Sequence, residues 1–441
     1  MGAFDWRALS AALCVAWCAH AQAQAPAFIV GVGTHLLNAE TDVRPALAKA
    51  HEAGIGSVRD DAWWGHVERQ KNQLGVPPAW GRYLNALQPL GMSTVLILGY
   101  GNSAYNNNAK PAFESVRGGF LGYTAFVTQQ LKGRVDYWEI YNEWDIAKPR
   151  FGLEGDSKSY LKLVELAAPV VRAQAPEAKV LAGAITAEGI KAGFADRLLQ
   201  GGVMNHADGL SLHPYVHCEK SDNGYKPEHW IGWLRKLSAR FDAEAGKPVP
   251  LYLTEMGWHS TGDRHPCGVS QSTQAAFLAR SFLLARTLPA IKGMWWYDLI
   301  DDGTDPAEQE HHFGLLNPDL SPKPAFNVLK AIAPQVAGGQ FEAAGSLLGG
   351  PWAVLLSEGG HQRLAVWADG SDTSLTVRVE GGQPGPLKAL DLATPEQGYR
   401  PIASQWECTA GRCQASVPLT GFPLVIDLGD ARGLPFDAAQ D

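Results

Sequence analysis

The sequence predicts a (β/α)8 barrel, an α/β fold, followed by an antiparallel β-sandwich, and three observations support this. Over roughly 300 residues, about the usual barrel length, eight apolar strand-like runs alternate with amphipathic helical segments. Polar and acidic residues stand at the carboxyl ends of several of these runs, where a barrel carries its functional residues. From about residue 338 the pattern changes to short apolar runs separated by Gly, Asp, Ser and Pro, which is typical of an antiparallel sandwich.

Turn residues and helix caps separate the expected elements in order along the chain. For example, Thr41 or Asp42 can cap the start of the first helix, and Gly54 can end it. A Gly/Asn-rich loop at 101–108 follows the third strand. The predicted strands are 28–37, 55–64, 92–100, 136–145, 179–186, 209–215, 250–258 and 292–299. The predicted helices are 41–54, 78–90, 115–131, 157–174, 190–199, 229–245, 272–287 and 323–332.

A doubly wound open sheet shows the same local alternation of strands and helices. The count of eight strands favours the barrel. Gly31 and Gly33 also lie inside the first strand and lack the third spaced glycine of a phosphate-binding turn. We therefore expect a barrel at residues 26–337 and a sandwich domain at 338–441.

The first 25 residues resemble an export signal. Residues 8–19 are small and apolar, Arg7 precedes them, and 19–25 offers several A-x-A cleavage sites. Asp5 offsets Arg7, so a buried or disordered N-terminal helix is the alternative. The apolar run is too short to span a membrane. We expect a secreted or periplasmic protein with a signal peptide at 1–25 and no membrane insertion after cleavage.

Composition narrows the classes of partner. The 441 residues are 46% hydrophobic and 19% charged, which is typical of a globular chain that can bury a large core. A formal net charge of −8 without a long Lys/Arg run argues against nucleic acid and anionic membrane surfaces. Fifteen tryptophans suit either an aromatic core or stacking on sugar rings. We expect a monomer that acts on a polysaccharide or oligosaccharide.

Signal cleavage would leave four cysteines: Cys218, Cys267, Cys408 and Cys413. Cys408 and Cys413 flank a turn with Gly411, and Cys218 and Cys267 follow the sixth and seventh predicted strands, which are neighbours in a barrel. Two disulfides in an oxidising compartment are therefore expected. Four free, partly buried thiols are the alternative.

Two glutamates at strand ends form a candidate catalytic pair. Glu143 ends the aromatic fourth strand, and Glu255 ends the seventh strand. Glycoside hydrolysis with retention uses two carboxyl groups roughly 5 Å apart, one as nucleophile and one as acid/base. The ends of these strands face each other across a barrel mouth, which suits that spacing. Asn142 is placed to bind a sugar 2-hydroxyl, and an apolar neighbour such as Trp144 would favour the protonated form of an acid.

Further polar and aromatic residues at strand ends are candidates for substrate binding. Donors such as Arg59, His213 and Tyr215 would keep a nucleophilic carboxylate ionised. The remaining candidates are His35, Asp60, Trp63, Tyr100, Asn102, Tyr105, Trp258, Trp296 and Asp298. For the aromatic residues, core packing is the alternative to sugar stacking, and for the acids, including Asp61, Asp301 and Asp302, it is solvation or capping.

Other chemistries find little support. His217 and Cys218 near His213 match no zinc spacing, so no metal is predicted. The pair His311-His312 is more typical of a loop. A Gly-x-Ser-x-Gly nucleophile elbow is absent from the sequence. No cofactor is expected.

The strand-end residues resemble those of the large clan of retaining barrel glycosidases. The residues that carry the resemblance are Arg59, Asn142-Glu143, His213-Pro-Tyr215, Glu255 and Trp295-Trp296. Within the clan the chain resembles glycoside hydrolase family 39, and most of all the secreted PslG-type endoglycosidases encoded with bacterial exopolysaccharide pathways. The resemblance covers about residues 28–335. Members often have Pro after the acid/base, where this chain has Trp144, which affects the subfamily more than the mechanism.

This resemblance implies Glu143 as acid/base and Glu255 as nucleophile of a retaining O-glycosyl hydrolase. The expected function is endo-acting cleavage of a bacterial exopolysaccharide. One alternative is an exo-acting, β-xylosidase-like enzyme of family 39. The other, from a different class, is a catalytically silent carbohydrate-binding protein of exopolysaccharide or biofilm assembly.

Overall fold

The structure is a computed structural model that describes residues 28–146, 155–221, 223–346, 351–358, 360–368, 373–381 and 385–430. The expected signal peptide at 1–25 lies outside these residues. Within the described part of the chain, no helix has both the length and the apolar character needed to cross a bilayer.

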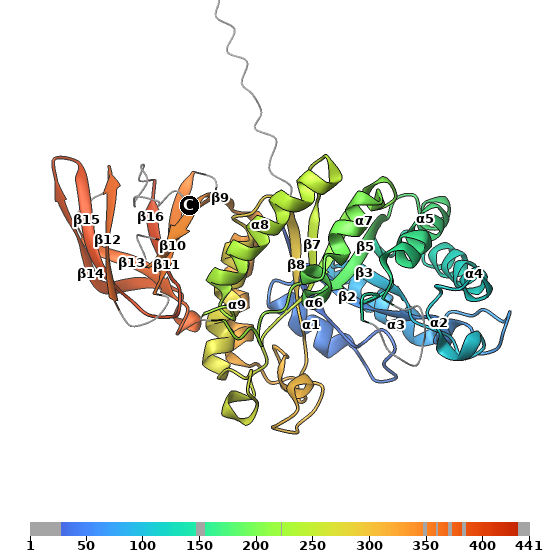
Figure 1. The fold of residues 1–441 in the computed structure, drawn as a ribbon. Coiled ribbons are helices and arrows are strands. Elements are labelled where there is room, and N and C mark those ends of the chain that lie inside the picture. The colour runs from blue at the N-terminus through green and yellow to red at the C-terminus, as the bar shows by residue number, and fades with distance from the viewer. Residues whose placement is uncertain are drawn as a thin grey trace, which may run out of the picture.

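Eight parallel strands close into a barrel in sequence order, as predicted, with β8 pairing back onto β1. Figure 1 shows the barrel with its helices and, beside it, the C-terminal sheet. The barrel strands are β1 (Ile29–Gly33), β2 (Ser57–Trp63), β3 (Ser93–Gly99), β4 (Tyr137–Ile140), β5 (Lys179–Thr186), β6 (Gly209–His213), β7 (Leu251–Met256) and β8 (Ile291–Trp296). Most predicted strands agree to within a few residues. The largest difference is β4, which stops at Ile140, five residues before the predicted end at 145.

The helices surround the barrel. They are α1 (Arg44–Glu52), α2 (Trp64–Val67), α3 (Pro78–Leu87), α4 (Glu114–Gln130), α5 (Ser157–Gln174), α6 (Ala187–Lys191), α7 (Phe194–Gln200), α8 (Pro227–Ala245), α9 (Gln271–Ala285) and α10 (Pro324–Gly338). The short α2 and α6 directly follow β2 and β5, and the sequence pattern did not predict α2.

Bulky side chains fill the lower barrel interior, so this end is a packed core. Val95, Leu181, Tyr252 and Trp295 form a buried cluster there. Gly31 lies against Trp295, and a Cβ at position 31 would come within 2.3 Å of the indole. Glycine in the first strand is therefore explained by close packing, which agrees with the absence of a phosphate-binding turn.

The C-terminal domain is antiparallel, as predicted, but its strands form one continuous eight-stranded sheet that curls on itself. The long β14 (Tyr399–Thr409) pairs with β13 along its first part and with β15 at its end, so it joins the two halves. Side chains of β10 and β11 pack against those of β12 and β15 in a separate core. The other strands are β9 (Gln340–Ser346), β10 (Trp352–Glu358), β11 (His361–Trp367), β12 (Thr373–Glu380), β13 (Gly385–Asp391), β15 (Arg412–Leu419) and β16 (Leu424–Gly429).

A buried ion pair joins this sheet to the barrel. Arg280 of α9 binds Glu228 of α8 through two hydrogen bonds, of 2.6 and 2.5 Å. Trp367 of β11 donates its indole N–H to the same carboxylate at 2.7 Å. The ion pair is buried, and the Glu228 carboxylate accepts hydrogen bonds both from the barrel, through Arg280, and from the sheet, through Trp367. It therefore fixes the sheet against α8 and α9 (Figure 1).

Candidate active site

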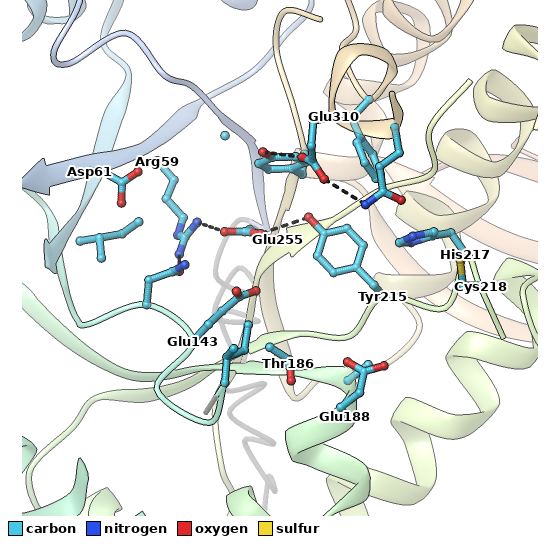
Figure 2. A pocket seen from close by; sticks show the side chains of 18 of the residues that line it. Arg59, Asp61, Glu143, Thr186, Glu188, Tyr215, His217, Cys218, Glu255 and Glu310 are labelled. Carbon is cyan, nitrogen blue, oxygen red and sulfur yellow. Dashed lines mark hydrogen bonds and ion pairs between the residues drawn. The ribbon is translucent and has the colours of Figure 1, made fainter. Parts of the chain in front are cut away.

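The carboxyl ends of the barrel strands line a cavity of about 720 Å³. Arg59 of β2, Asn142 and Glu143 after β4, Tyr215 after β6 and Glu255 of β7 all face it, as predicted (Figure 2). Residues up to about 200 positions apart in the chain therefore converge at the end of the barrel where such folds carry their sites.

The backbone after β4 turns sharply and brings Glu143 to this cavity. Tyr141 has φ 64° and Glu143 has φ 47°, a left-handed conformation that side-chain-bearing residues rarely adopt. The Glu143 N–H donates to the Ala184 carbonyl at 3.1 Å. Lys110 binds the carbonyls of Trp144 and Ile146 at 2.9 and 3.0 Å. These contacts hold a backbone conformation that costs energy on its own, as is common at functional sites.

Arg59 is the central cation of the site. Its buried guanidinium donates to Glu255 at 2.7 Å, to Asn142 at 2.8 Å and to Glu139 at 2.7 Å. Glu139 is the charged residue inside β4, and the sequence analysis missed it because it considered polar residues at strand ends only. The three contacts fix the orientation of the Asn142 amide and of the Glu255 carboxylate.

Glu255 is held in its ionised form. Tyr215 donates its hydroxyl to Glu255 Oε2 at 3.1 Å, and His213 Nδ1 lies 3.5 Å from the same oxygen. Burial acts to raise the pKa of Glu255, but His213, Arg59 and the Tyr215 hydroxyl outweigh it and lower the pKa below its usual value. A depressed pKa suits a nucleophile, which reacts as the anion.

His213 connects the two glutamates. Its Nδ1 lies 2.9 Å from Glu143 Oε1, and its ring is fully buried. One carboxylate oxygen of Glu143, one of Glu255 and a ring nitrogen of His213 all lie within 4.8 Å of one another. Burial lowers the pKa of His213, yet the Glu255 and Glu143 carboxylates raise it above its ordinary value. The two carboxyl groups thus have the short separation that a retaining glycosidase requires.

Removing the Tyr215 hydroxyl should shift the acidic side of the pH profile of kcat/KM. Because its hydrogen bond lowers the Glu255 pKa, the native enzyme should keep kcat/KM down to below the ordinary carboxyl pKa. In Tyr215→Phe the acidic side of the profile should move up by about one pH unit, the rough value of one hydrogen bond to a charged group. The kcat/KM profile measures this. Tyr297→Phe is the control, since the Tyr297 hydroxyl donates to Glu310; an equal shift in both variants would contradict the assignment.

Three predicted sugar contacts are wrong. Trp144, Trp258 and Trp296 are fully buried and do not line the cavity. Their indole N–H groups donate to the carbonyls of Asp156, Tyr225 and Phe313, respectively. An indole that is enclosed by protein and satisfied by a backbone carbonyl belongs to the core, so Trp144 does not form a wall of the cleft.

Trp144→Ala should therefore cost stability. Deleting a buried tryptophan side chain typically costs about 3–5 kcal/mol. Trp63, with 44% of its surface exposed, is the matched control, and Trp63→Ala should cost clearly less than Trp144→Ala because nearly half of its side chain already contacts water. Denaturant or thermal unfolding measures both. Equal stability of the two variants would show that Trp144 is not a core residue.

Two further predictions fail because loop contacts use the side chains. Asn102 donates to the Glu68 carbonyl and accepts from the Ala104 N–H, and Tyr105 donates to the Glu68 carboxylate. Both are buried and neither lines the cavity. They stabilise the loop after β3.

Asp60 reaches the cavity wall, but its carboxylate mainly holds the loop after β1. Its Oδ2 accepts hydrogen bonds from the Thr34 hydroxyl at 2.7 Å and from the N–H groups of Leu36 and Leu37 at 2.7 and 2.9 Å. An oxygen that already accepts three hydrogen bonds has little capacity left for a ligand.

Trp63 and Tyr100 remain as aromatic candidates. Both line a second cavity of about 620 Å³, which shares Tyr100, Asn142, Glu143 and Ile146 with the first. Trp63 stacks on His66 with ring centroids 5.4 Å apart. Half-exposed and supported from behind, it can offer a face to a sugar ring.

Residues that follow the first and last barrel strands lie at the rim of the main cavity. His35 lines the cavity and lies 3.1 Å from Asp302. Asp298 is buried and lines a neighbouring cavity with Asp301 and Asp302. Tyr297, at the end of the eighth strand, also lines the main cavity, as do Glu310 and Glu188, which the sequence analysis did not identify. Only the density of acids and histidines at 298–312 hinted at Glu310.

Both predicted disulfides are present, between Cys218 and Cys267 and between Cys408 and Cys413. The first joins the loops after β6 and β7, and Cys218 lines the cavity. The second closes the hairpin of β14 and β15, where the two cysteines pair across the strands.

No protein-family model matches this sequence, and no curated protein matches it. Solved structures do. A family 39 glycoside hydrolase from Bacteroides cellulosilyticus matches with TM-score 0.74 and 24% identity, over 92% of this chain and 81% of that one. A monomeric beta-xylosidase from Caulobacter crescentus matches with TM-score 0.62 and 17% identity, over 90% and 95%.

A family 30 subfamily 8 xylanase from Clostridium acetobutylicum matches with TM-score 0.61 and 12% identity, over 91% of this chain and 97% of that one. At such identities the likeness concerns architecture. It shows that a parallel eight-stranded barrel followed by a β-sheet domain is a fold that this chain shares with known glycoside hydrolases.

Proposed function

We propose that this protein is a retaining glycoside hydrolase that works by double displacement. The observation that carries the proposal is the pair of carboxylates at the strand ends. Oxygens of Glu143 and Glu255 lie within 4.8 Å of each other, and Arg59 and Tyr215 bind Glu255 while His213 binds Glu143. Retaining glycosidases separate their carboxyl groups by about 5–5.5 Å, whereas inverting enzymes leave room for a water at about 6.5–9.5 Å.

In the first step Glu255 attacks the anomeric carbon while Glu143 protonates the leaving oxygen. The glycosyl-enzyme ester then forms on Glu255. In the second step Glu143 removes a proton from water, which attacks the same carbon and releases Glu255. Asn142 accepts the Arg59 hydrogen bond through its Oδ1, so its NH₂ group remains for a hydroxyl next to the anomeric carbon.

A long substrate is supported by the shape of the site. The two cavities adjoin at Glu143, which lines both, and Trp63 offers a partly exposed ring in the second one. Binding on both sides of the scissile bond is what internal cleavage requires. We therefore propose endo action on a polysaccharide, with a bacterial exopolysaccharide of the PslG-type pathways as the expected substrate class.

The size of the first products separates endo from exo action. An endo-acting enzyme releases a ladder of oligosaccharides from a long chain early in the reaction. Release of monosaccharide alone would favour the β-xylosidase-like alternative.

Covalent labelling of Glu255 tests the mechanism. A 2-deoxy-2-fluoro glycoside with a good leaving group should trap the ester, and mass spectrometry of the peptides should place the label on Glu255. The panel should include gluco, manno and xylo configurations. Glu255→Gln is the unlabelled control. Oligosaccharide binding without label or turnover would favour a carbohydrate-binding protein.

An oxidising compartment is supported by the two disulfides. We propose that the protein is secreted or periplasmic, with a signal peptide at 1–25, a catalytic barrel at 26–337 and a sheet domain at 338–441. N-terminal sequencing of the exported protein tests the cleavage site.

A further inference from the structure

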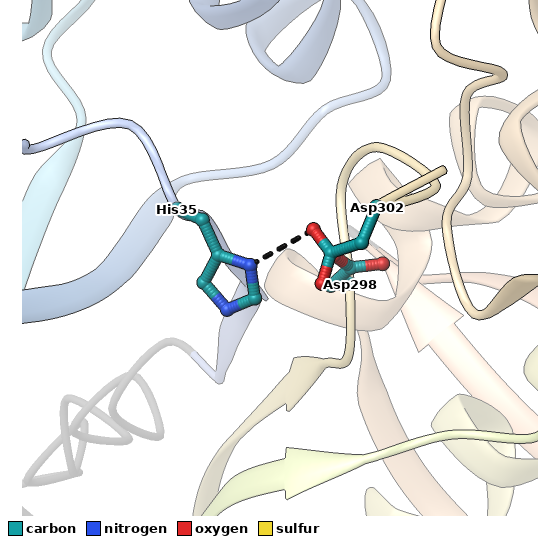
Figure 3. A group of neighbouring side chains, drawn as sticks. All are labelled: His35, Asp298 and Asp302. Atoms are coloured by element: carbon teal, nitrogen blue, oxygen red, sulfur yellow. Dashed lines mark hydrogen bonds and ion pairs between the residues drawn. The ribbon is translucent and has the colours of Figure 1, made fainter. Parts of the chain in front are cut away.

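A second cluster of ligand-type side chains lies beside the proposed active site, where the chain leaves β1 and β8. It consists of His35, Asp298 and Asp302, and each offers one ligand atom such that these atoms lie within 4.8 Å of one another (Figure 3). Together with Thr34 and Pro318, they line a separate cavity of about 300 Å³.

One oxygen of the buried Asp298 carboxylate lacks a hydrogen-bond partner within the described part of the chain. Only 2% of Asp298 is exposed, and its Oδ1 is buried without a hydrogen-bond partner among the described residues. A buried carboxylate oxygen without a donor is costly, so it calls for an explanation such as an ion. A merely solvated acid would not be enclosed in this way.

The local charge favours a dication. Asp298, Asp301 and Asp302 stand close together, and Lys323 binds one of them, Asp301, at 2.8 Å. When a metal ion is bound, His35 is neutral and the aspartates are ionised, so the three carboxylates and Lys323 together carry two negative charges in excess. One divalent cation would balance it.

The spacing suits metal ligation as well as a hydrogen bond. His35 Nδ1 lies 3.1 Å from Asp302 Oδ1. Ligands at about 2.0–2.2 Å from one metal ion and roughly at right angles have this separation. A set of one imidazole and two carboxylates fits a first-row divalent ion such as Zn²⁺ or Mn²⁺ better than Ca²⁺, which prefers oxygen ligands alone.

We propose that His35, Asp298 and Asp302 bind one first-row divalent metal ion, completed by water. The ion would tie the loop after β1 to the loop after β8. Both loops also line the main cavity, through Thr34 and His35 on one side and Tyr297 on the other. The site is therefore expected to stabilise one wall of the active-site cleft, and it takes no part in the two-glutamate chemistry.

Titration of the full, tag-free chain with Zn²⁺ and, separately, Mn²⁺ by calorimetry tests the proposal. We expect one equivalent to bind to the wild type and to raise its melting temperature. Asp298→Asn and Asp302→Asn should each weaken binding by at least about 100-fold, more than is usual for residues that only support metal ligands. The His35→Gln variant keeps a hydrogen-bond donor to Asp302 but lacks the imidazole ligand, so it should also lose the ion. This result would show that His35 binds the metal ion and does more than form a hydrogen bond to Asp302.

Two control variants make the result specific. Asp427→Asn breaks another half-exposed His–Asp pair, to His361 on the sheet domain, and should leave binding unchanged. Glu143→Gln removes a member of the other possible ligand group in the described structure, Glu143, His213 and Glu255, and should also leave it unchanged. The proposal is overturned if neither ion binds, if the cluster variants bind like the wild type, or if Glu143→Gln abolishes binding. None of these readouts depends on glycosidase activity.

Discussion

Replacing Glu255 with glutamine should abolish turnover, lowering kcat by at least about 10⁴-fold, as is typical when a nucleophile is lost. The amide has the shape of the carboxylate but cannot form the glycosyl ester. Arg59 and Tyr215 currently donate to the two oxygens of Glu255; the amide oxygen can still accept one of these bonds, but the NH₂ group cannot accept the other. The variant should therefore fold, with some loss of stability, yet show no detectable hydrolysis.

Steady-state kinetics and circular dichroism on the same preparation measure both effects. Glu188→Gln is the matched control, because Glu188 is an exposed acid of the same cavity whose carboxylate makes no hydrogen bond to the described residues, and it should change kcat little. Glu255→Gly in the presence of azide sharpens the test. Azide should enter the space left by the side chain and give a glycosyl azide of inverted configuration. A Glu255→Gln variant with wild-type turnover would remove Glu255 from the mechanism.

The sequence predicted the barrel and the catalytic pair for one physical reason. The alternation of apolar runs and helices determines the strand order in a barrel, and strand order alone places the ends of β4 and β7 across the same opening. Thus Glu143 and Glu255 could be paired although 112 positions separate them in the sequence. No side-chain detail was needed for this step.

The tryptophan predictions failed because burial after a strand end depends on contacts that are distant in sequence. Trp144 follows Glu143 directly, yet it points into the packing between Tyr141 and Tyr160. Its direction follows from the left-handed backbone at Tyr141 and Glu143, which the Ala184 carbonyl and Lys110 stabilise. Neither contact can be read from the residues around position 144.

Glu139 was missed for a related reason. Arg59 of β2 and Glu139 of β4 both flank β3, but they pair with different residues of it: Arg59 with Val95 and Glu139 with Ile97. Arg59 and Glu139 are therefore offset by two residues along the barrel strands. Only the stagger of the closed barrel, together with the length of the arginine side chain, brings them into contact at 2.7 Å. A strand pattern read from the sequence contains no information on this stagger.

Glu143→Gln should have an effect that depends on the leaving group, because Glu143 is proposed to act through its proton. On a natural polysaccharide the variant should lose about 10²–10⁴-fold in kcat/KM, the usual contribution of general acid catalysis. A dinitrophenyl glycoside leaves without protonation, so its first step should be nearly as fast as in the wild type. The second step lacks a base, and the ester on Glu255 should accumulate and give a burst of dinitrophenolate.

Stopped-flow absorbance measures the burst, and the variants of the two glutamates should give opposite results. Glu255→Gln cannot form the ester and should show no burst with any leaving group. The burst therefore distinguishes a nucleophile from an acid/base that both lie beside His213, although each is essential for the natural substrate. Equal losses for Glu143→Gln on activated and natural substrates would contradict its role as the acid. They would indicate instead that its bond to His213 serves to align Glu255.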